Sequence, residues 1–213
     1  MPQLSSQASS QKPPQLGARA VRQRIVSGAR RHFLAHGFRN VTMDDVAQEL
    51  GMSKKTLYAH FTSKVELLRA VIRDKFHELN ATLEDITPHA KDDVVAILQS
   101  LLAVVLHHAQ EIQPAFVRDI RRETPEVFQL VERLRQEAIQ LHFGRVFVAG
   151  QQRGLVRKDL SARILIEILL GVTQVIVNPT KLAELKLTPE RGFQITSSVV
   201  LEGVLTSRGR AKR

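Results

Sequence analysis

The sequence predicts an all-α protein of about nine helices, and three observations lead to this fold class. Apolar residues recur at helical spacing, as in one stripe formed by Val21, Ile25, Ala29 and Phe33. No segment alternates polar and apolar residues for long, and no Asn-Gly or Asp-Gly pair marks a hairpin. Ser, Thr, Gly and Pro stand repeatedly where helices are expected to begin or end.

The N-terminal helices follow from these signals, and we expect them to cover residues 18–36, 43–50, 54–60 and 63–85. Gly37 stands where a left-handed residue ends the first helix. Thr42 and Ser53 are the expected N-caps of the two short helices. Ser63 and Glu66 have the spacing of a capping box, which opens the long helix.

The rest of the chain continues in the same way, with helices predicted over residues 91–111, 115–123, 125–154, 161–178 and 189–207. Thr124 and Thr188 each precede a proline, which is typical of an N-cap followed by the first helical position. The most apolar run, residues 164–177, contains Glu167 and is shorter than the roughly 20 residues of a membrane span. We therefore expect a buried helix there.

Charge is unevenly distributed along the 213 residues, whose formal net charge is +10. The first 65 residues contain ten basic and three acidic side chains, whereas residues 66–206 contain 17 and 18. A basic N-terminal third on a near-neutral body predicts an anion-binding module joined to a second domain. The absence of Cys excludes disulfides, thiolate metal sites and cysteine nucleophiles.

The two short helices and the Gly51 turn between them match a helix-turn-helix. We expect four apolar side chains to pack against Phe33 of the first helix: Val46, Leu50, Leu57 and Phe61. The side chains left outward on the second short helix are Lys54, Lys55, Thr56, Tyr58 and His60. None of them is a carboxylate, so this helix fits the major groove of DNA.

This stretch resembles the TetR family of transcriptional regulators over about residues 18–68. The resemblance rests on Gly37, Thr42, Asp45-Val46-Ala47, Gly51, Ser53, Leu57-Tyr58, His60-Phe61, Lys64, and Leu67 or Leu68 at the family's spacing. It implies base contacts by Lys54, Lys55 and Thr56, on the helix that Ser53 caps. It also implies phosphate contacts by Thr42, Tyr58, His60 and Lys64. Asp44 holds a position that sometimes reads a base, but an acid repels phosphate and we expect no contact.

Plainer explanations exist for the same residues. A basic face on a short helix is often only solvated, and His60 is also consistent with a satisfied histidine at the rim of the core. Tyr58 cannot share the buried side with Leu57, because adjacent helical residues point about 100° apart. The helix-turn-helix spacing favours DNA binding over these alternatives.

The body is expected to dimerise, because a helix that is apolar on all sides needs more cover than one monomer provides. The predicted dimer residues on the last two long helices are Ile164, Ile168, Val172, Val175, Val199, Val200 and Val204. The alternative is that these helices form the core of the monomer. By resemblance only, a ligand pocket is expected in the body, with candidate lining residues His107, His108, Phe116, His142, Phe143, Phe147 and Gln174.

The resulting prediction is a sequence-specific DNA-binding regulator, a repressor that a small, mostly apolar ligand releases from a pseudo-palindromic operator. An activator of the same fold and a nonspecific DNA-binding protein are the alternatives. Catalytic motifs of hydrolases, P-loop enzymes and dinucleotide-binding enzymes are missing, so no enzyme is predicted. No metal, cofactor or membrane partner is expected; His32 and His36 have the i, i+4 spacing of metal ligands but lack the Glu of an H-E-x-x-H motif.

The predicted domain organisation has four parts. Residues 1–17 are rich in Ser, Gln and Pro and lack the apolar run of a signal peptide, so they are expected to be a disordered arm. The helix-turn-helix domain covers residues 18–64, and the ligand-binding and dimerisation domain covers residues 65–207. A basic tail occupies residues 208–213. A cytoplasmic location is expected for such a chain.

Overall fold

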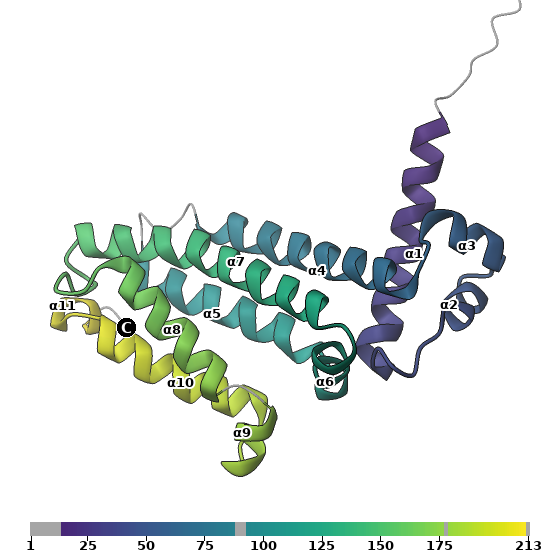
Figure 1. Ribbon diagram of the computed structural model, residues 1–213. Helices are drawn as coiled ribbons and strands as arrows, with labels where there is room; N and C mark the ends of the chain where they lie inside the picture. Colours follow the sequence, from purple (N-terminus) through teal and green to yellow (C-terminus); the bar gives the residue numbers. More distant parts are fainter. Residues whose placement is uncertain (1–13, 88–92, 177–178, 212–213) are drawn as a thin grey trace, which may run out of the picture.

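The computed structural model describes residues 14–87, 93–176 and 179–211; of the side chains in these ranges, those of 14–16, 173–174, 179–180 and 189–190 lie outside the description. The described chain is almost entirely helical and contains no strand (Figure 1). The helices are α1 (Pro14–His36), α2 (Met43–Glu49), α3 (Lys54–His60), α4 (Lys64–Ile86), α5 (Val94–Gln110), α6 (Pro114–Glu123), α7 (Pro125–Gln152), α8 (Ala162–Ile176), α9 (Pro179–Glu184), α10 (Pro189–Val204) and α11 (Ser207–Arg210).

The predicted all-α fold is confirmed, and the differences concern the ends of helices and two short ones. The first helix begins at Pro14 rather than Ala18, so residues 14–17 are helical and not part of an arm. The remainder of the predicted arm, residues 1–13, lies outside the described residues. The short helices α9 and α11 were not predicted.

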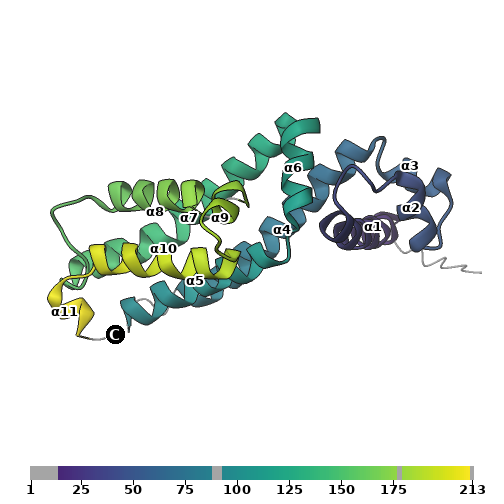
Figure 2. The same cartoon turned by 90° about the horizontal axis from the view of Figure 1, so that it is seen from below.

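The helices form a small head and a long body that α4 connects. Figure 1 shows α1, α2 and α3 at one end of the molecule, and α4 running from them along the body beside α7. Seen from below, α5 and α10 lie side by side, while α8 packs on α7 and α10 (Figure 2). Helix α6 turns away from α5 by 76° and stands across the end of the body that faces the head.

Two hydrophobic cores stabilise this arrangement. The body core is built mainly from α4, α5, α7, α8 and α10, and Phe143 and Phe147 are its largest fully buried side chains. The N-terminal core is built from α1 to α4 but also includes Phe116 and Ile120 of α6 and Val127 of α7. The hydrophobic contacts of the head therefore extend past the predicted domain boundary at residue 64.

The helix caps agree with the sequence in most places. The Thr42, Ser53, Ser63 and Thr188 hydroxyls each accept the expected backbone N–H at the start of a helix. Two predictions were wrong in detail. The Glu66 carboxylate accepts from the Thr62 N–H and hydroxyl rather than from Ser63, so the predicted capping box is only half formed. The Thr124 side chain makes no cap bond; its hydroxyl donates instead to the Ile120 carbonyl of the preceding helix.

Within the described ranges, no single helix has the length and apolar composition needed to cross a membrane. Only the sharply bent pair α5 and α6, taken together, reaches that length and composition.

Candidate nucleic-acid interface

Buried side chains fix the direction in which α3 points. Leu57 and Phe61 are completely buried and Leu50 nearly so, all in the N-terminal core, as predicted. The chain turns between α2 and α3 at Gly51, whose φ of +60° suits glycine. Arg24 of α1 donates to the Leu50 carbonyl at 2.7 Å and ties the first helix to this turn. The head therefore holds α3 by one side and leaves the other side outward.

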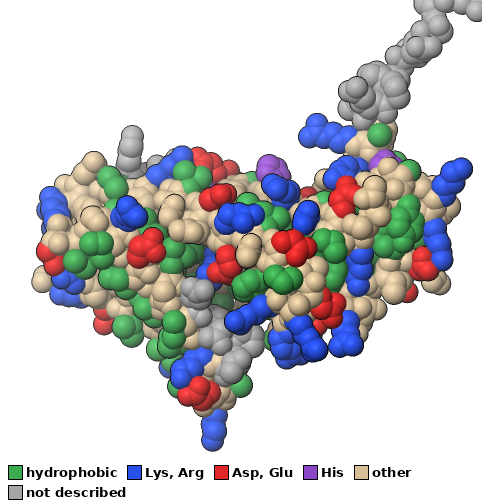
Figure 3. Space-filling view, viewed as in Figure 1, with side chains coloured by type: hydrophobic (Ala, Val, Ile, Leu, Met, Phe, Trp, Pro, Cys, Tyr) green, Lys and Arg blue, Asp and Glu red, His purple; other side chains and the backbone are tan. Residues whose placement is uncertain are grey.

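The outward side of α3 carries the predicted polar residues. Lys54, Lys55 and Thr56 are exposed, and Tyr58 keeps 46% of its surface exposed. The Ser53 side chain accepts the Thr56 N–H at 3.1 Å and lies 2.9 Å from the Thr56 hydroxyl, so it caps the helix as expected. Figure 3 shows Lys and Arg side chains at the end of the molecule formed by α1 to α3.

One carboxylate does approach this helix, although none belongs to it. The Lys54 ammonium donates to the Asp44 carboxylate of α2 at 2.6 Å. This hydrogen bond and the charge of Asp44 raise the pKa of Lys54 above its ordinary value. Asp44 therefore lies within the candidate interface as the partner of Lys54, a contact that the sequence did not predict.

The predicted phosphate ligands Thr42 and His60 are partly occupied by bonds within the head. The Thr42 hydroxyl donates to the Asp45 carboxylate at 2.7 Å and accepts the Asp45 N–H at 3.1 Å. His60 is half-buried, and its carbonyl accepts from Arg22 at 3.3 Å. Arg22 of α1 lies over the Phe61 ring, 4.1 Å from its centre. It is a cation beside α3 that the sequence did not single out, since only folding brings α1 to this end.

Lys64 occupies a different environment from the lysines of α3. It is half-buried, with its ammonium 4.2 Å from the centre of the Phe38 ring and 3.4 Å from the Arg39 carbonyl oxygen. Burial lowers the pKa of Lys64, and the charges of Glu123, Asp119 and Asp45 oppose this shift. Lys64, the predicted phosphate ligand, is thus only partly open to solvent and lies at the junction of the head with α6.

Asp119 of α6 also connects α6 to the head at this junction. Its carboxylate accepts the Arg39 N–H at 2.9 Å. The approach is possible because Gly37, at φ +82°, has no Cβ; an added Cβ would stand 2.8 Å from Asp119 Oδ2. Gly37 also closes α1 by donating to the Phe33 carbonyl, as predicted for a left-handed C-cap. Helix α6 is therefore bound directly to the loop that leads into α2.

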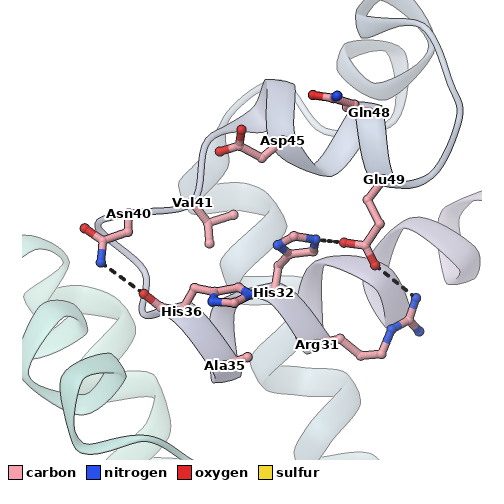
Figure 4. Close-up of a pocket in the computed structure, with 9 residues that line it drawn as sticks. All are labelled: Arg31, His32, Ala35, His36, Asn40, Val41, Asp45, Gln48 and Glu49. Atoms are coloured by element: carbon pink, nitrogen blue, oxygen red, sulfur yellow. Dashed lines mark hydrogen bonds and ion pairs between the residues drawn. The ribbon is translucent and has the colours of Figure 1, made fainter.

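A hollow of about 680 Å³ lies between α1 and α2 on the head, and Figure 4 shows the residues that line it. His32 pairs with the Glu49 carboxylate, which also contacts Arg31 at 3.4 Å. Asn40 donates to the His36 carbonyl at 3.2 Å at the edge of the hollow. Within the described residues no three His, Asp or Glu side chains are arranged to hold a metal ion. The contacts of Glu49 on α2 with His32 and Arg31 on α1 therefore join the two helices beside the hollow.

The predicted ligand-pocket residues are not brought together. Phe143 and Phe147 are packed inside the body core, but Phe116 belongs to the N-terminal core. His107 is exposed on α5, and His108 is buried. His142 is fully buried, and its ring nitrogens lie near Thr87 and Asn80. The side chain of Gln174 lies outside the described part of the structure. These residues therefore do not line one shared cavity.

A groove of about 630 Å³ lies instead between α5 and α10, and it is lined by apolar side chains with some polar ones. The main apolar residues are Leu102, Ala103 and Leu106 of α5 and Phe193, Ile195 and Val199 of α10. The Ser197 hydroxyl, also on the lining, is buried and has no hydrogen-bond partner in the described chain. Arg191 lines the groove and is exposed to solvent.

The predicted dimer residues divide between the surface and the core. Ile164, Ile168 and Val175 of α8 and Val199 of α10 are 42–66% exposed, and Val172 is half-buried. Val200 and Val204, also predicted for the dimer interface, are buried in the body core, as the alternative of a monomer core expects for these two residues. The outward apolar residues of α10 are Ile195 and Val199, one helical turn apart.

Comparison with known proteins adds to this geometry. A family model described as "Bacterial regulatory proteins, tetR family" matches residues 25–71. The HTH-type transcriptional regulator TtgW of Pseudomonas putida is 37% identical over 71 residues, which are 33% of this chain and 51% of that protein. The match thus spans about half the length of that relative.

Two other relatives match over most of their length. The HTH-type transcriptional regulator UidR of Escherichia coli is 27% identical over 91% of this chain and 97% of that protein. A crystal structure of a transcriptional regulator from Saccharomonospora viridis, in complex with choline, superposes with a TM-score of 0.67 at 20% identity. That superposition covers 88% of this chain and 99% of the other chain.

The head with its helix-turn-helix, the helical body and these similarities agree with one another. The family model thus covers the helix-turn-helix of the head, and over most of its length the chain is similar to an HTH-type transcriptional regulator.

Proposed function

We propose that the protein is a dimeric, sequence-specific DNA-binding repressor that a small-molecule effector releases from its operator. The observation that carries the proposal is the outward face of α3, where Lys54, Lys55 and Thr56 are exposed while Leu57 is buried. A short helix held in this way fits the major groove, where its side chains read base edges. The repressor would act in the cytoplasm, where its DNA is.

The apolar outward residues of α8 and α10 support a dimer. Ile164, Ile168 and Val175 follow one side of α8, and Ile195 and Val199 follow one side of α10. Two packed helices that each expose such a row can bury it against the same pair of a second copy. The dimer presents two α3 helices, and a separation of about 34 Å suits successive major grooves of a pseudo-palindrome.

The groove between α5 and α10 is the candidate effector site, and it borders the proposed dimer face because Ile195 and Val199 belong to both. Its volume of about 630 Å³ lies within the usual range for small-molecule sites, and its lining is mostly apolar with a few polar groups. The buried Ser197 hydroxyl lacks a partner in the described chain, which supports a ligand with a polar group. The complex of a related regulator with choline supports a small-molecule effector in general.

The contact between α6 and the head offers a route from effector to DNA. Asp119 binds the backbone of Arg39, and Phe116 is part of the N-terminal core, so a shift of α6 moves the head. The effector must bind the released conformation more tightly than the DNA-binding one. A hundredfold difference supplies about 2.7 kcal/mol of coupling.

The test is selection of bound duplexes from a random pool by the purified protein. The wild-type protein should enrich one two-fold symmetric sequence. Lys55→Ala should lose the preference at one base pair in each half, at a cost of about 1–3 kcal/mol for that position. Selection of no sequence above the starting pool would refute sequence-specific binding and favour a nonspecific DNA-binding protein.

A further inference from the structure

The ion pair between Lys54 and Asp44 sets Lys54 apart from its neighbour on α3. The Lys54 ammonium and the Asp44 carboxylate are 2.6 Å apart although both side chains are more than half exposed. In the described part of the chain Lys55 has no carboxylate partner, and it stands one residue further along the same helix. An approaching anion therefore meets a charge-balanced pair at Lys54 and an unbalanced positive charge at Lys55.

The pair has a local electrostatic cause. Helix α3 begins with Lys54 and Lys55 and has no acidic residue in its first turn. Positive side chains are unfavourable there, because the N-terminal end of a helix carries a partial positive charge. Asp44 reaches across from the first turn of α2, where its own negative charge is favourable. The Asp44 carboxylate thus offsets the positive charge at the N-terminal ends of both α2 and α3.

The two kinds of DNA contact differ in how they respond to such a pair. Nonspecific binding comes from phosphates, which are anions and gain little from a lysine whose charge a carboxylate already balances. A guanine edge is neutral and offers two acceptors, O6 and N7. An ammonium has three N–H donors, so Lys54 can keep Asp44 on one and offer the other two to guanine.

We propose that Asp44 is a specificity-determining residue: it neutralises Lys54 toward phosphate while leaving it able to donate to a base edge. This inference rests on the proposed DNA-binding function and goes beyond it. Lys54 then adds little to binding at random sites and contributes where the sequence offers acceptors. Lys55 has no such partner among the described residues, so its full charge contacts phosphate at a random site, where it meets no matching base.

The probe is a duplex of random sequence, titrated with the full-length protein at several salt concentrations. One added phosphate contact steepens the dependence of log K on log salt by about 0.9, which is about eightfold in affinity at 0.1 M salt. Asp44→Asn should show this gain on random duplex, and Lys54→Ala in the Asp44→Asn background should remove it. Lys55→Ala in the otherwise wild-type protein should reduce the slope by about 0.9, whereas the double variant Lys54→Ala/Asp44→Asn, which removes both charges of the pair, should keep nearly the wild-type slope.

Two control variants separate this effect from net charge and from folding. Asp159→Asn removes an equally exposed carboxylate that pairs with Arg157, in the connection of α7 to α8 at the other end of the molecule. It should leave the slope unchanged. Asp44→Glu keeps the charge and should keep the wild-type slope. The helical content of each variant is checked by circular dichroism.

Two results would overturn the inference. One is an equal loss of slope for Lys55→Ala and for the double variant Lys54→Ala/Asp44→Asn, and the other is a gain for Asp44→Asn no larger than for Asp159→Asn. A wild-type protein that binds random duplex and selects an operator while showing either result leaves the proposed function standing. Wild-type binding that is absent or insensitive to salt overturns the proposed function itself, and this inference with it.

Discussion

Replacing Gly37 by Ala tests how firmly α6 holds the head. Gly37 has a φ of +82°, where a Cβ costs about 1–2 kcal/mol. The new Cβ would also stand 2.8 Å from Asp119 Oδ2, which accepts the Arg39 N–H. Moving this carboxylate loses a hydrogen bond to a charged acceptor, worth about 1.5 kcal/mol. We therefore expect Gly37→Ala to lower the free energy of unfolding by about 2.5–3.5 kcal/mol.

Gly51→Ala is the matched control for this substitution. Its φ of +60° is also left-handed, but nothing lies within 4 Å of an added Cβ, so the loss should be about 1–2 kcal/mol. Urea unfolding at one fixed protein concentration measures both losses. In an Asp119→Ala background, Gly37→Ala should cost no more than Gly51→Ala. Equal losses for the two glycines in the otherwise wild-type chain would refute the account of Asp119.

The body offers two further tests. Burial lowers the pKa of His142 below its ordinary 6.5, so the unfolded chain takes up a proton at a pH where the folded protein does not. The free energy of unfolding should therefore fall as the pH drops below about 6.5, and His142→Gln should flatten this fall in urea unfolding; an unchanged fall would contradict the assignment. Val199→Asp should give a monomer in analytical sedimentation, because its side chain is 66% exposed on the proposed dimer face. Leu141→Asp, 44% exposed on α7, should leave the mass of the assembly unchanged, and a dimeric Val199→Asp protein would speak against this face.

The sequence predicted well those features, such as helix caps, that depend on residues close together in the chain. The caps at Thr42, Ser53 and Thr188 involve partners three residues away, so the residue types alone identify them. Thr124 differs because its hydroxyl donates to the Ile120 carbonyl of the preceding helix and accepts no N–H of its own helix, and the Thr-Pro spacing does not distinguish these two arrangements. Helices α9 and α11, with six and four residues, are too short to show a periodic pattern.

The sites were harder to predict, since they depend on contacts between distant residues. The exposed face of α3 follows from its own periodicity, but the Asp44 partner of Lys54 comes from another helix. Phe116 and Phe147 are equally apolar in the sequence, yet packing assigns them to different cores. Val199 and Val200 are adjacent, and only the direction of α10 decides that the first is exposed and the second buried.

The extension of the N-terminal core into α6 and α7 has a consequence for protein engineering. Phe116, Ile120 and Val127 are at most 2% exposed and fill the same core as α1. A chimera that joins the first 64 residues of a related regulator to this body would pack foreign side chains against Phe116, Ile120 and Val127. Such a fusion point divides one packing unit, so a functional exchange of heads has to carry α6 and the first turn of α7 along with it.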